Sequence, residues 1–287
     1  EDALTFIVSV KVVNMIITIF LNIVLVILYK KTKYINYLIK MSLKIGLNLS
    51  TNYSVNFDQP KRSKKLIKYI IIHYTGMKKE HDSINRLCEE KSKVSSHYFI
   101  KNNGITLRLV PDLYTAWHAG ASNWKNLESL NHYSIGIELH NPGHDNGYRK
   151  FSINQILSLK KLLRFLIKKY KIKYQNVLGH SDISPSRKKD PGEKFPWKEL
   201  AKEKLCLWHE LNYSSIKKFR RKNLNLSEEK FFLKNLKKIG YSHIKNMSFY
   251  KSNKLIIKAF QRRFRQELIN GKSDKECFLI SKNLLNT

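Results

Sequence analysis

Two histidines lie at the ends of apolar, strand-like segments, where reactive side chains often gather. His73 follows the run 66–72, and His180 follows the shorter run 176–179. Side chains at strand ends collect at the edge of a sheet, above a cleft. An imidazole in that position can ligate a metal ion, so a functional role is favoured for both residues. Four other histidines are interpreted as structural: His81, His132, His209 and His243.

Glu138 brings a carboxylate into the strand-like run 134–139, between Ile137 and Leu139. A carboxylate that faced the core without a partner would be costly. Glu138 is therefore either an outward-facing strand residue or a general base whose pKa is raised by partial burial. A general base contributes roughly 10² to 10⁴ in rate.

A lysine and an aspartate two positions apart form a third chemical signal. Lys188 and Asp190 would point the same way in an extended segment. The ammonium group could then stabilise the oxyanion of a tetrahedral transition state. The alternative is that Lys188 is one more solvated cation in the run Arg187-Lys188-Lys189.

The elements that would position these side chains alternate between strands and helices. The turn sequence Asn102-Asn103-Gly104 predicts a hairpin. The clearest helix begins at Ser152, where Gln155 completes a capping box, and 80–91 is also helix-like. Strand-like runs occupy residues 66–72, 96–100, 105–110, 134–139 and 176–179. The pattern predicts an α/β fold with a mixed central β-sheet flanked by helices.

Five short segments contain these residues and their neighbours. They read IIIHYTG at 70–76, SSHYFI at 95–100, AWHAG at 116–120, SIGIELHNPG at 134–143 and GHSDISPSRKKDPGEKFPW at 179–197. In order and spacing they resemble the type 2 N-acetylmuramoyl-L-alanine amidases, whose fold is shared with a phage lysozyme and with peptidoglycan recognition proteins. The resemblance covers about residues 66–205.

Matched residue by residue, the resemblance implies one zinc ion per chain, with His73, His180 and Asp190 as ligands and water in the fourth place. Zinc lowers the pKa of its water from 15.7 to about 7, which provides a nucleophile at neutral pH. The resemblance also implies that Glu138 is the general base and that Lys188 stabilises the oxyanion.

Loops of this family line the groove for glycan and peptide, which implies further residues at the site. Trp117 and His118 in AWHAG, Asn141 in HNPG and, beside the metal motif, Arg187 are the expected substrate contacts. Packing or turn formation is the alternative for Trp117 and Asn141. His97 in SSHYFI is expected to support the fold.

The implied activity is hydrolysis of the amide bond between the lactyl group of N-acetylmuramic acid and L-alanine, in peptidoglycan or muropeptides. Such an enzyme would serve cell-wall degradation, remodelling or recycling. The alternative is a module that recognises peptidoglycan without cutting it. Relatives of that kind lack part of the metal set, whereas all five matched residues are present here, and this favours catalysis.

The C-terminal part changes in character to short helical segments, predicted at 228–239, 254–266 and 273–285. The sequence AFQRRF at 259–264 resembles the three-helix peptidoglycan-binding domain of wall hydrolases, which would tether the enzyme to its substrate. Residues expected to share the bundle core are Phe231, Leu236, Ile256, Phe260, Phe264 and Leu279. The predicted organisation is an apolar segment 1–40, a lead-in 41–65, a catalytic domain 66–205, a linker 206–221 and a helical domain 222–287.

The N-terminal segment contains 18 uncharged residues, 12–29, followed by Lys30, Lys31 and Lys33. About 20 residues are needed to span a bilayer, so 12–29 is a candidate membrane anchor. The lysines after it would place the remaining chain in the cytoplasm. A non-native extension over 1–40 is the other interpretation. A wall-binding domain favours the cell envelope, as a periplasmic or secreted protein, with a cytoplasmic location as the alternative.

The net charge of +32, from 54 basic and 22 acidic residues, would attract nucleic acid, anionic lipid or cell wall. The lysines are spread along the whole chain, and no established nucleic-acid recognition motif is present, so no nucleic-acid partner is expected. Cys88, Cys206 and Cys277 form no C-x-x-C pair and predict neither a disulfide scaffold nor a thiolate zinc site.

Overall fold

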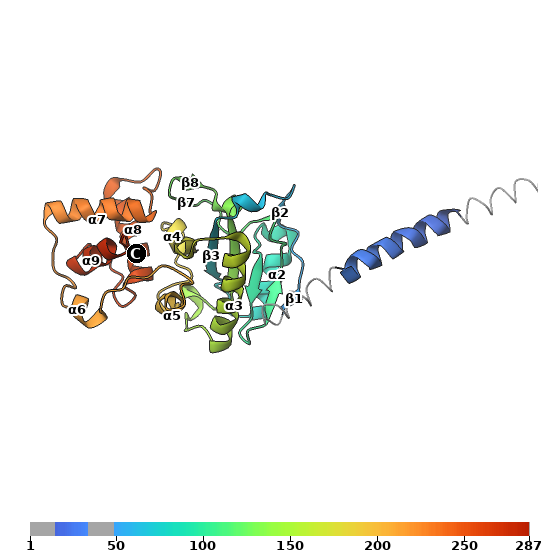
Figure 1. Cartoon of the computed structure of the whole chain (residues 1–287), viewed down its shortest axis with the longest axis horizontal. Coiled ribbons are helices and arrows are strands. Elements are labelled where there is room, and N and C mark those ends of the chain that lie inside the picture. Colours follow the sequence, from blue (N-terminus) through green and yellow to red (C-terminus); the bar gives the residue numbers. More distant parts are fainter. Residues whose placement is uncertain (1–14, 34–48, 287) are drawn as a thin grey trace, which may run out of the picture. The chain divides into compact units, whose positions relative to one another are not determined.

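The computed structural model of the chain describes residues 15–33 and 49–286 (Figure 1). It divides into two compact units, Glu1–Leu49 and Ser50–Thr287. The predicted apolar run 12–29 and lead-in 41–65 are covered only in part, because residues 12–14 and 41–48 lie outside the described residues.

The first unit contains the helix Met15–Lys33, whose 19 residues are long and apolar enough to cross a membrane. At 1.5 Å per residue it measures about 28 Å, close to the thickness of a bilayer core. A signal sequence near an N-terminus meets the same criteria. Its large apolar side chains are exposed along the helix.

A six-stranded mixed sheet organises the second unit, in the order β1-β5-β4-β9-β3-β10. Strands β4, β9, β3 and β10 run parallel to one another, and β5 runs antiparallel to β4 as the predicted hairpin. The predicted mixed α/β fold is confirmed. The bounds are β1 Leu49–Thr51, β3 Tyr69–Tyr74, β4 Tyr98–Ile100, β5 Thr106–Arg108, β9 Ser134–Leu139 and β10 Val177–Gly179.

Central strands β3 and β9 are buried on both faces, which explains their nearly continuous apolar sequences. The residues Ile70, Ile71 and Ile72 of β3 have no exposed surface, and the same holds for Ile135 and Ile137 of β9. Parallel pairing therefore brings the polar residues at the carboxyl ends of these strands to one edge of the sheet.

Helix α3 (Ile153–Tyr170) packs on the sheet and begins at the predicted capping box. Its buried face contains Leu159, Leu162, Leu163 and Leu166, and also Gln155. Gln155 is buried because its amide donates a 2.8 Å hydrogen bond to the carbonyl of His140 as well as completing the cap. Other helices of the catalytic part are α2 Glu80–Cys88, α4 His180–Ile183 and α5 Trp197–Ala201.

Two short ribbons and several single turns complete this part of the chain. The ribbons pair β2 (Phe57–Asp58) with β6 (Thr115–Ala116) and β7 (Asn123–Trp124) with β8 (Leu127–Glu128). The 3-10 turns are Lys64–Leu66, Glu90–Ser92, Leu130–Tyr133, His144–Asn146 and Tyr174–Asn176.

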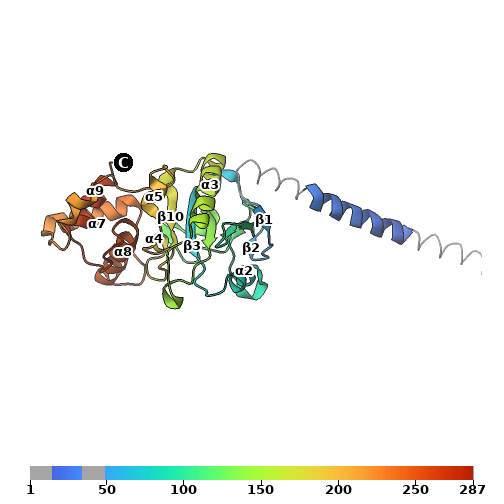
Figure 2. The same cartoon turned by 90° about the horizontal axis from the view of Figure 1, so that it is seen from below.

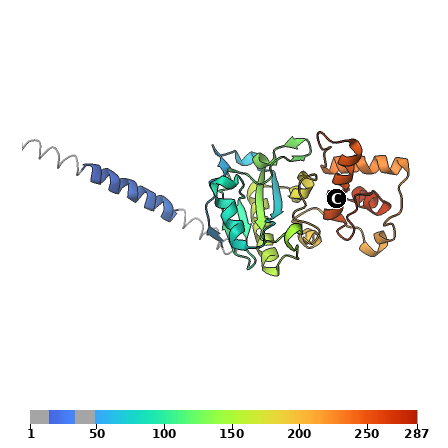
Figure 3. The same ribbon diagram turned by 180° about the vertical axis from the view of Figure 1, so that it is seen from behind.

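The C-terminal helices are α6 Tyr213–Lys217, α7 Leu226–Ile239, α8 Phe249–Phe264 and α9 Lys275–Asn283. They lie together beyond β10 and α4, and α8 is beside α4 (Figures 1, 2 and 3). The three predicted helices are present. The domain boundaries drawn at residues 206–221 remain predictions.

The predicted bundle core was wrong at Phe231, which is 55% exposed, whereas Phe232 is fully buried. Next to Leu279, which is only partly buried, Ile280 takes the core position. Adjacent helical residues lie 100° apart, so an error of one residue moves a side chain out of the apolar face.

One apolar cluster joins the C-terminal helices to the sheet. Ile71 of β3 and Leu178 of β10 belong to the same cluster as Phe232, Phe260 and Phe264 of the C-terminal helices. Residues 50–287 accordingly form one compact unit.

Candidate active site

His73, His180 and Asp190 meet at the carboxyl edge of the sheet. The Nδ1 atoms of the two histidines are 2.9 Å apart, and the Asp190 Oδ2 atom lies 3.1 Å from the first and 3.0 Å from the second. Strand pairing produces this meeting, because Gly179 of β10 is in register with Ile72 of β3 and each histidine follows directly. All three side chains are buried.

The other ring nitrogen of each histidine determines its tautomer. His180 Nε2 lies 3.0 Å from the carbonyl oxygen of Ala119, which can only accept, so Nε2 carries the proton. The hydroxyl of Ser134 donates to the Leu130 carbonyl, so its oxygen accepts from His118 Nε2 at 3.2 Å.

The proton of His73 is assigned by the same chain of contacts. Because His118 Nε2 donates, His118 Nδ1 accepts from His73 Nε2 at 3.1 Å. Both Nδ1 atoms therefore carry lone pairs that face each other and the carboxylate of Asp190. Three acceptors converge without a proton between them, and a cation is the partner that satisfies all three.

The donor set and its dimensions fit zinc. Ligand atoms 2.0–2.1 Å from a tetrahedral zinc ion lie roughly 3.3 Å from one another, and nitrogen and carboxylate oxygen are both zinc ligands. The observed separations of 2.9, 3.0 and 3.1 Å are close to this value. Among the described residues, this is the one group of three such side chains with a spacing that suits a metal ion.

The protonation states also suit a metal site. Burial, followed by the neighbouring His180, lowers the pKa of His73 to about 4. Near neutral pH the site presents a neutral imidazole and a carboxylate, the forms in which these side chains bind metal.

His118, an expected substrate contact, lines the cavity but has both ring nitrogens bonded to His73 and Ser134. Its ring lies against Gly136 of β9, where an added Cβ would be 2.4 Å from His118 Cγ. Only glycine leaves room for this ring. The neighbouring His97 supports β9 by accepting a 3.0 Å hydrogen bond from the Gly136 amide.

Glu138 is the β9 residue in register with His73, so both side chains leave the sheet on the same face. Its Oε2 atom is buried and has no hydrogen-bond partner within the described part of the chain. Burial, and to a smaller degree Asp190, raises the pKa of Glu138 to about 8, although Lys188 acts in the opposite direction.

A cavity of about 420 Å³ lies over these groups, a size that accommodates a small ligand. The expected residues Trp117, Arg187 and Lys188 line it. Trp117 is held by a 2.7 Å bond from its indole nitrogen to Asp58, and Arg187 by 2.9 Å bonds to the carbonyls of Ala119 and Ala121.

The fourth expected contact, Asn141, is not among the residues that line this cavity. Its side chain accepts from the Gly143 amide and donates to the Arg149 carbonyl, so it builds the turn after β9. A substrate contact for Asn141 remains a prediction without a lining position to support it.

Several residues at the site were missed by the sequence reasoning. Arg86 of α2 lines the cavity, as does Tyr74. The Tyr74 hydroxyl lies 2.8 Å from His144 Nδ1, and His144 Nε2 lies 3.0 Å from Glu193. Arg86 had no signal, because one basic residue on a helix is ordinary in a chain with 54 of them. The only sequence feature that pointed to Tyr74 was its position next to His73 in the motif IIIHYTG.

Comparison with known proteins places this site among the amidases of bacterial cell walls. Residues 62–193 match the family model described as N-acetylmuramoyl-L-alanine amidase. The N-acetylmuramoyl-L-alanine amidase AmiD of Escherichia coli is 34% identical over 254 residues, which cover 84% of this chain and 89% of AmiD. The 1,6-anhydro-N-acetylmuramyl-L-alanine amidase AmpD of Haemophilus influenzae is 41% identical over 106 residues, 37% of this chain and 55% of AmpD.

Solved structures agree with the sequence matches. AmiD from E. coli, in complex with the substrate anhydro-N-acetylmuramic acid-L-Ala-D-gamma-Glu-L-Lys, has 33% identity and a TM-score of 0.67, covering 80% of this chain and 91% of that one. AmpDh3 from Pseudomonas aeruginosa, in complex with anhydromuramic pentapeptide, has 27% identity and a TM-score of 0.68, covering 80% and 94%. These matches are longer than the segment 66–205, so the likeness includes C-terminal helices.

Proposed function

The chain belongs to the N-acetylmuramoyl-L-alanine amidase family, and we propose from this premise that it hydrolyses the amide bond between the lactyl group of N-acetylmuramic acid and L-alanine. The substrate is peptidoglycan or a muropeptide released from it. The complex of AmiD with an anhydro-muramyl peptide supports this substrate class.

One observation carries the assignment of the site. The two Nδ1 lone pairs and the Asp190 carboxylate converge within 3.1 Å of one another without a proton to share. His73, His180 and Asp190 would hold one zinc ion there. Zinc bound at this site supplies Lewis acidity that lowers the pKa of a water molecule to about 7.

Glu138 moves the proton in this reaction. Water oxygen attacks the lactyl carbonyl carbon, a C–O bond forms, and the carbonyl π electrons move to oxygen. Glu138 accepts the proton that the water loses and then donates it to the nitrogen of L-alanine as the C–N bond breaks. Burial raises the pKa of Glu138 toward neutral pH, and general acid–base catalysis works best with a pKa near the operating pH.

Positively charged side chains at the cavity would interact with the oxyanion of the transition state and with the peptide part of the substrate. Lys188 lines the cavity, and the resemblance to the family motif implies that it stabilises the oxyanion. Arg187 is held over the cavity by two carbonyls, and Arg86 lines it as well. These guanidinium groups are suited to the carboxylates of a stem peptide. Trp117 provides an apolar surface beside them.

The location that fits this activity is the cell envelope. The helix Met15–Lys33 is exposed and apolar, as a membrane anchor or signal would be. The C-terminal helices would add affinity for the polymer. Polymeric wall is the substrate for which both features are useful.

The experiment measures the release of stem peptide by mass spectrometry from intact sacculi and from 1,6-anhydro-muropeptides. The zinc-loaded chain is expected to release peptide that begins with L-alanine, and Asp190→Ala is the matched control without a complete metal site. Removing zinc with a chelator should abolish release, and added zinc should restore it. A fully metallated chain that binds muropeptides but releases no peptide would be a recognition module instead.

A further inference from the structure

A buried ion pair connects the metal site to the C-terminal helices. Asp182 of α4 lies two residues after His180, and its Oδ2 atom is 2.6 Å from Arg263 Nη1 of α8. The side chains are 0% and 3% exposed, respectively. The two residues are 81 positions apart in the sequence, so this contact exists only because α8 is packed beside α4.

The same carboxylate is bonded on every side. Tyr241, which follows α7, donates its hydroxyl to Asp182 Oδ1 at 2.7 Å. The amide of Gly179 donates to Oδ2 at 2.8 Å, which caps the short helix that begins at His180. Asp182 therefore links the C-terminal helices directly to the turn that contains His180, so a movement of these helices would also move that turn.

Arg263 holds both sides of that turn. Its Nη2 atom donates a 3.0 Å hydrogen bond to the carbonyl of Val177 in β10, before His180, while Nη1 holds Asp182 after it. The guanidinium lies 4.4 Å from the ring centre of Trp197. A planar fork held at both ends restricts movement of the turn more than a single contact would.

A shift of α4 would displace a second ligand as well. The amide of Ser181 donates to the carbonyl of Asp190 at 2.8 Å, and the junction at Gly179 is so close that an added Cβ would lie 2.8 Å from Pro191. Two of the three metal-binding side chains thus depend on where α4 sits.

We propose that Arg263 and Tyr241 are positioning residues for the zinc site, so that the C-terminal helices complete the metal centre in addition to any binding of cell wall. This inference rests on the proposed zinc amidase function. It predicts that the effect of these residues appears in metal affinity, because hydrogen bonds that orient the side chains holding a metal alter its affinity by about tenfold or more.

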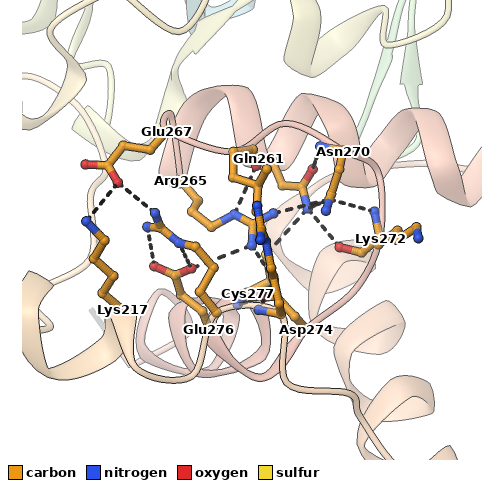
Figure 4. Close-up of polar contacts among 12 residues, drawn as sticks. Lys217, Gln261, Arg265, Glu267, Asn270, Lys272, Asp274, Glu276 and Cys277 are labelled. Carbon is orange, nitrogen blue, oxygen red and sulfur yellow. Dashed lines mark hydrogen bonds and ion pairs between the residues drawn. The ribbon is translucent and has the colours of Figure 1, made fainter.

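A nearby arginine offers a matched control. Arg265 is also 3% exposed and also forms buried ion pairs, with Asp274 and Glu276 (Figure 4). Its other contacts are with Leu268 and Asn270, so its network stays within the C-terminal helices. Arg265→Met therefore removes a comparable buried charge without touching α4.

The experiment uses the full chain and the variants Arg263→Met, Tyr241→Phe and Arg265→Met, each verified as folded by circular dichroism. Zinc dissociation constants are measured by competition with a chromogenic chelator. The absorption spectrum of the cobalt-substituted protein reports the geometry of the ligands. Arg263→Met should weaken zinc binding about tenfold and change the cobalt spectrum, Tyr241→Phe should act in the same direction with a smaller effect, and Arg265→Met should bind zinc as the wild type does.

Two results would overturn the proposal: unchanged zinc affinity in Arg263→Met and Tyr241→Phe, or an equal loss in Arg265→Met, which would indicate general loosening of the helices. Tyr241→Phe removes one hydroxyl only, so it decides the matter if Arg263→Met fails to fold. A wild-type chain that binds no zinc would overturn the proposed function itself and would be recognised as such before any variant is compared.

Discussion

The protons on three histidines decide whether this site can hold a metal ion. The positions of these protons follow from two carbonyl oxygens, which can only accept. The Ser134 hydroxyl must donate to the carbonyl of Leu130, and His180 Nε2 must donate to the carbonyl of Ala119. The relay from Ser134 through His118 to His73 leaves the metal-facing nitrogen of His73 unprotonated. His118 would thus act on the proposed zinc ion through His73.

Replacing His118 by phenylalanine tests this relay. The ring volume is kept, but His73 Nε2 loses its partner, so we expect zinc affinity to fall roughly 10-fold to 100-fold. Chelator competition measures the loss. His81→Phe, on the outer face of α2, is the control and should bind zinc as the wild type does. Equal affinity in His118→Phe would contradict the relay.

Glu138 can be tested independently of the metal. Glu138→Gln keeps the shape but cannot accept a proton, so we expect kcat/KM for a muramyl peptide to fall about 10² to 10⁴ with zinc content unchanged. Glu128→Gln, whose side chain is 56% exposed in a pair with Lys245, should leave both unchanged. Full activity in Glu138→Gln would remove Glu138 from the mechanism.

Strands and helices place these residues through close packing as well as through register. Strand β9 contributes Ser134, Gly136 and Glu138 at every second position. One six-residue strand therefore provides the hydroxyl that contacts His118, the space beneath the His118 ring and the proposed general base. A side chain at position 136 would overlap the His118 ring.

Gly136→Ala is expected to destabilise the fold by about 1–3 kcal/mol, because the new methyl group overlaps the His118 ring. Urea unfolding measures this loss. Combined with His118→Ala, the same change should be much less costly, since the clashing ring is gone. Strict additivity of the two substitutions would show that the overlap is not the cause.

The molecule as a whole joins a catalytic sheet and a set of helices through one apolar cluster and through buried polar contacts. His209 belongs to the connecting segment between them and is 8% exposed. Burial lowers its pKa to about 4, so the folded protein keeps this ring neutral where an unfolded chain would protonate it.

Stability should therefore fall with acidity. Below the unfolded pKa of about 6.5 the unfolded chain takes up a proton that folded His209 refuses, until the pH approaches about 4. Across this window His209 contributes a loss of up to about 1.4 kcal/mol per pH unit. Urea unfolding from pH 7 to pH 4 should show a shallower decline for His209→Gln than for the wild type. Parallel curves would exclude this contribution.

Patterns along the chain were sufficient for the local elements. Strand β9 and the capping box at Ser152 were predicted with their observed residues, because strand alternation and caps depend on near neighbours. The core of the C-terminal helices was misplaced at Phe231, since the choice between adjacent aromatic residues depends on which neighbour the helix faces. The burial of Gln155 also depends on a tertiary neighbour, because its side-chain amide donates a hydrogen bond to the carbonyl of His140.

By itself, the sequence determined the class of fold, the strand ends that carry reactive side chains, and, through five motifs, the family and its reaction. Only the tertiary structure decided which nitrogens face the metal position, why Gly136 must be a glycine, and that Arg263 reaches Asp182. Such contacts join residues up to 117 positions apart and leave no periodic trace. They arise from strand register and from the shape of the packed core, which exist only after the chain has folded.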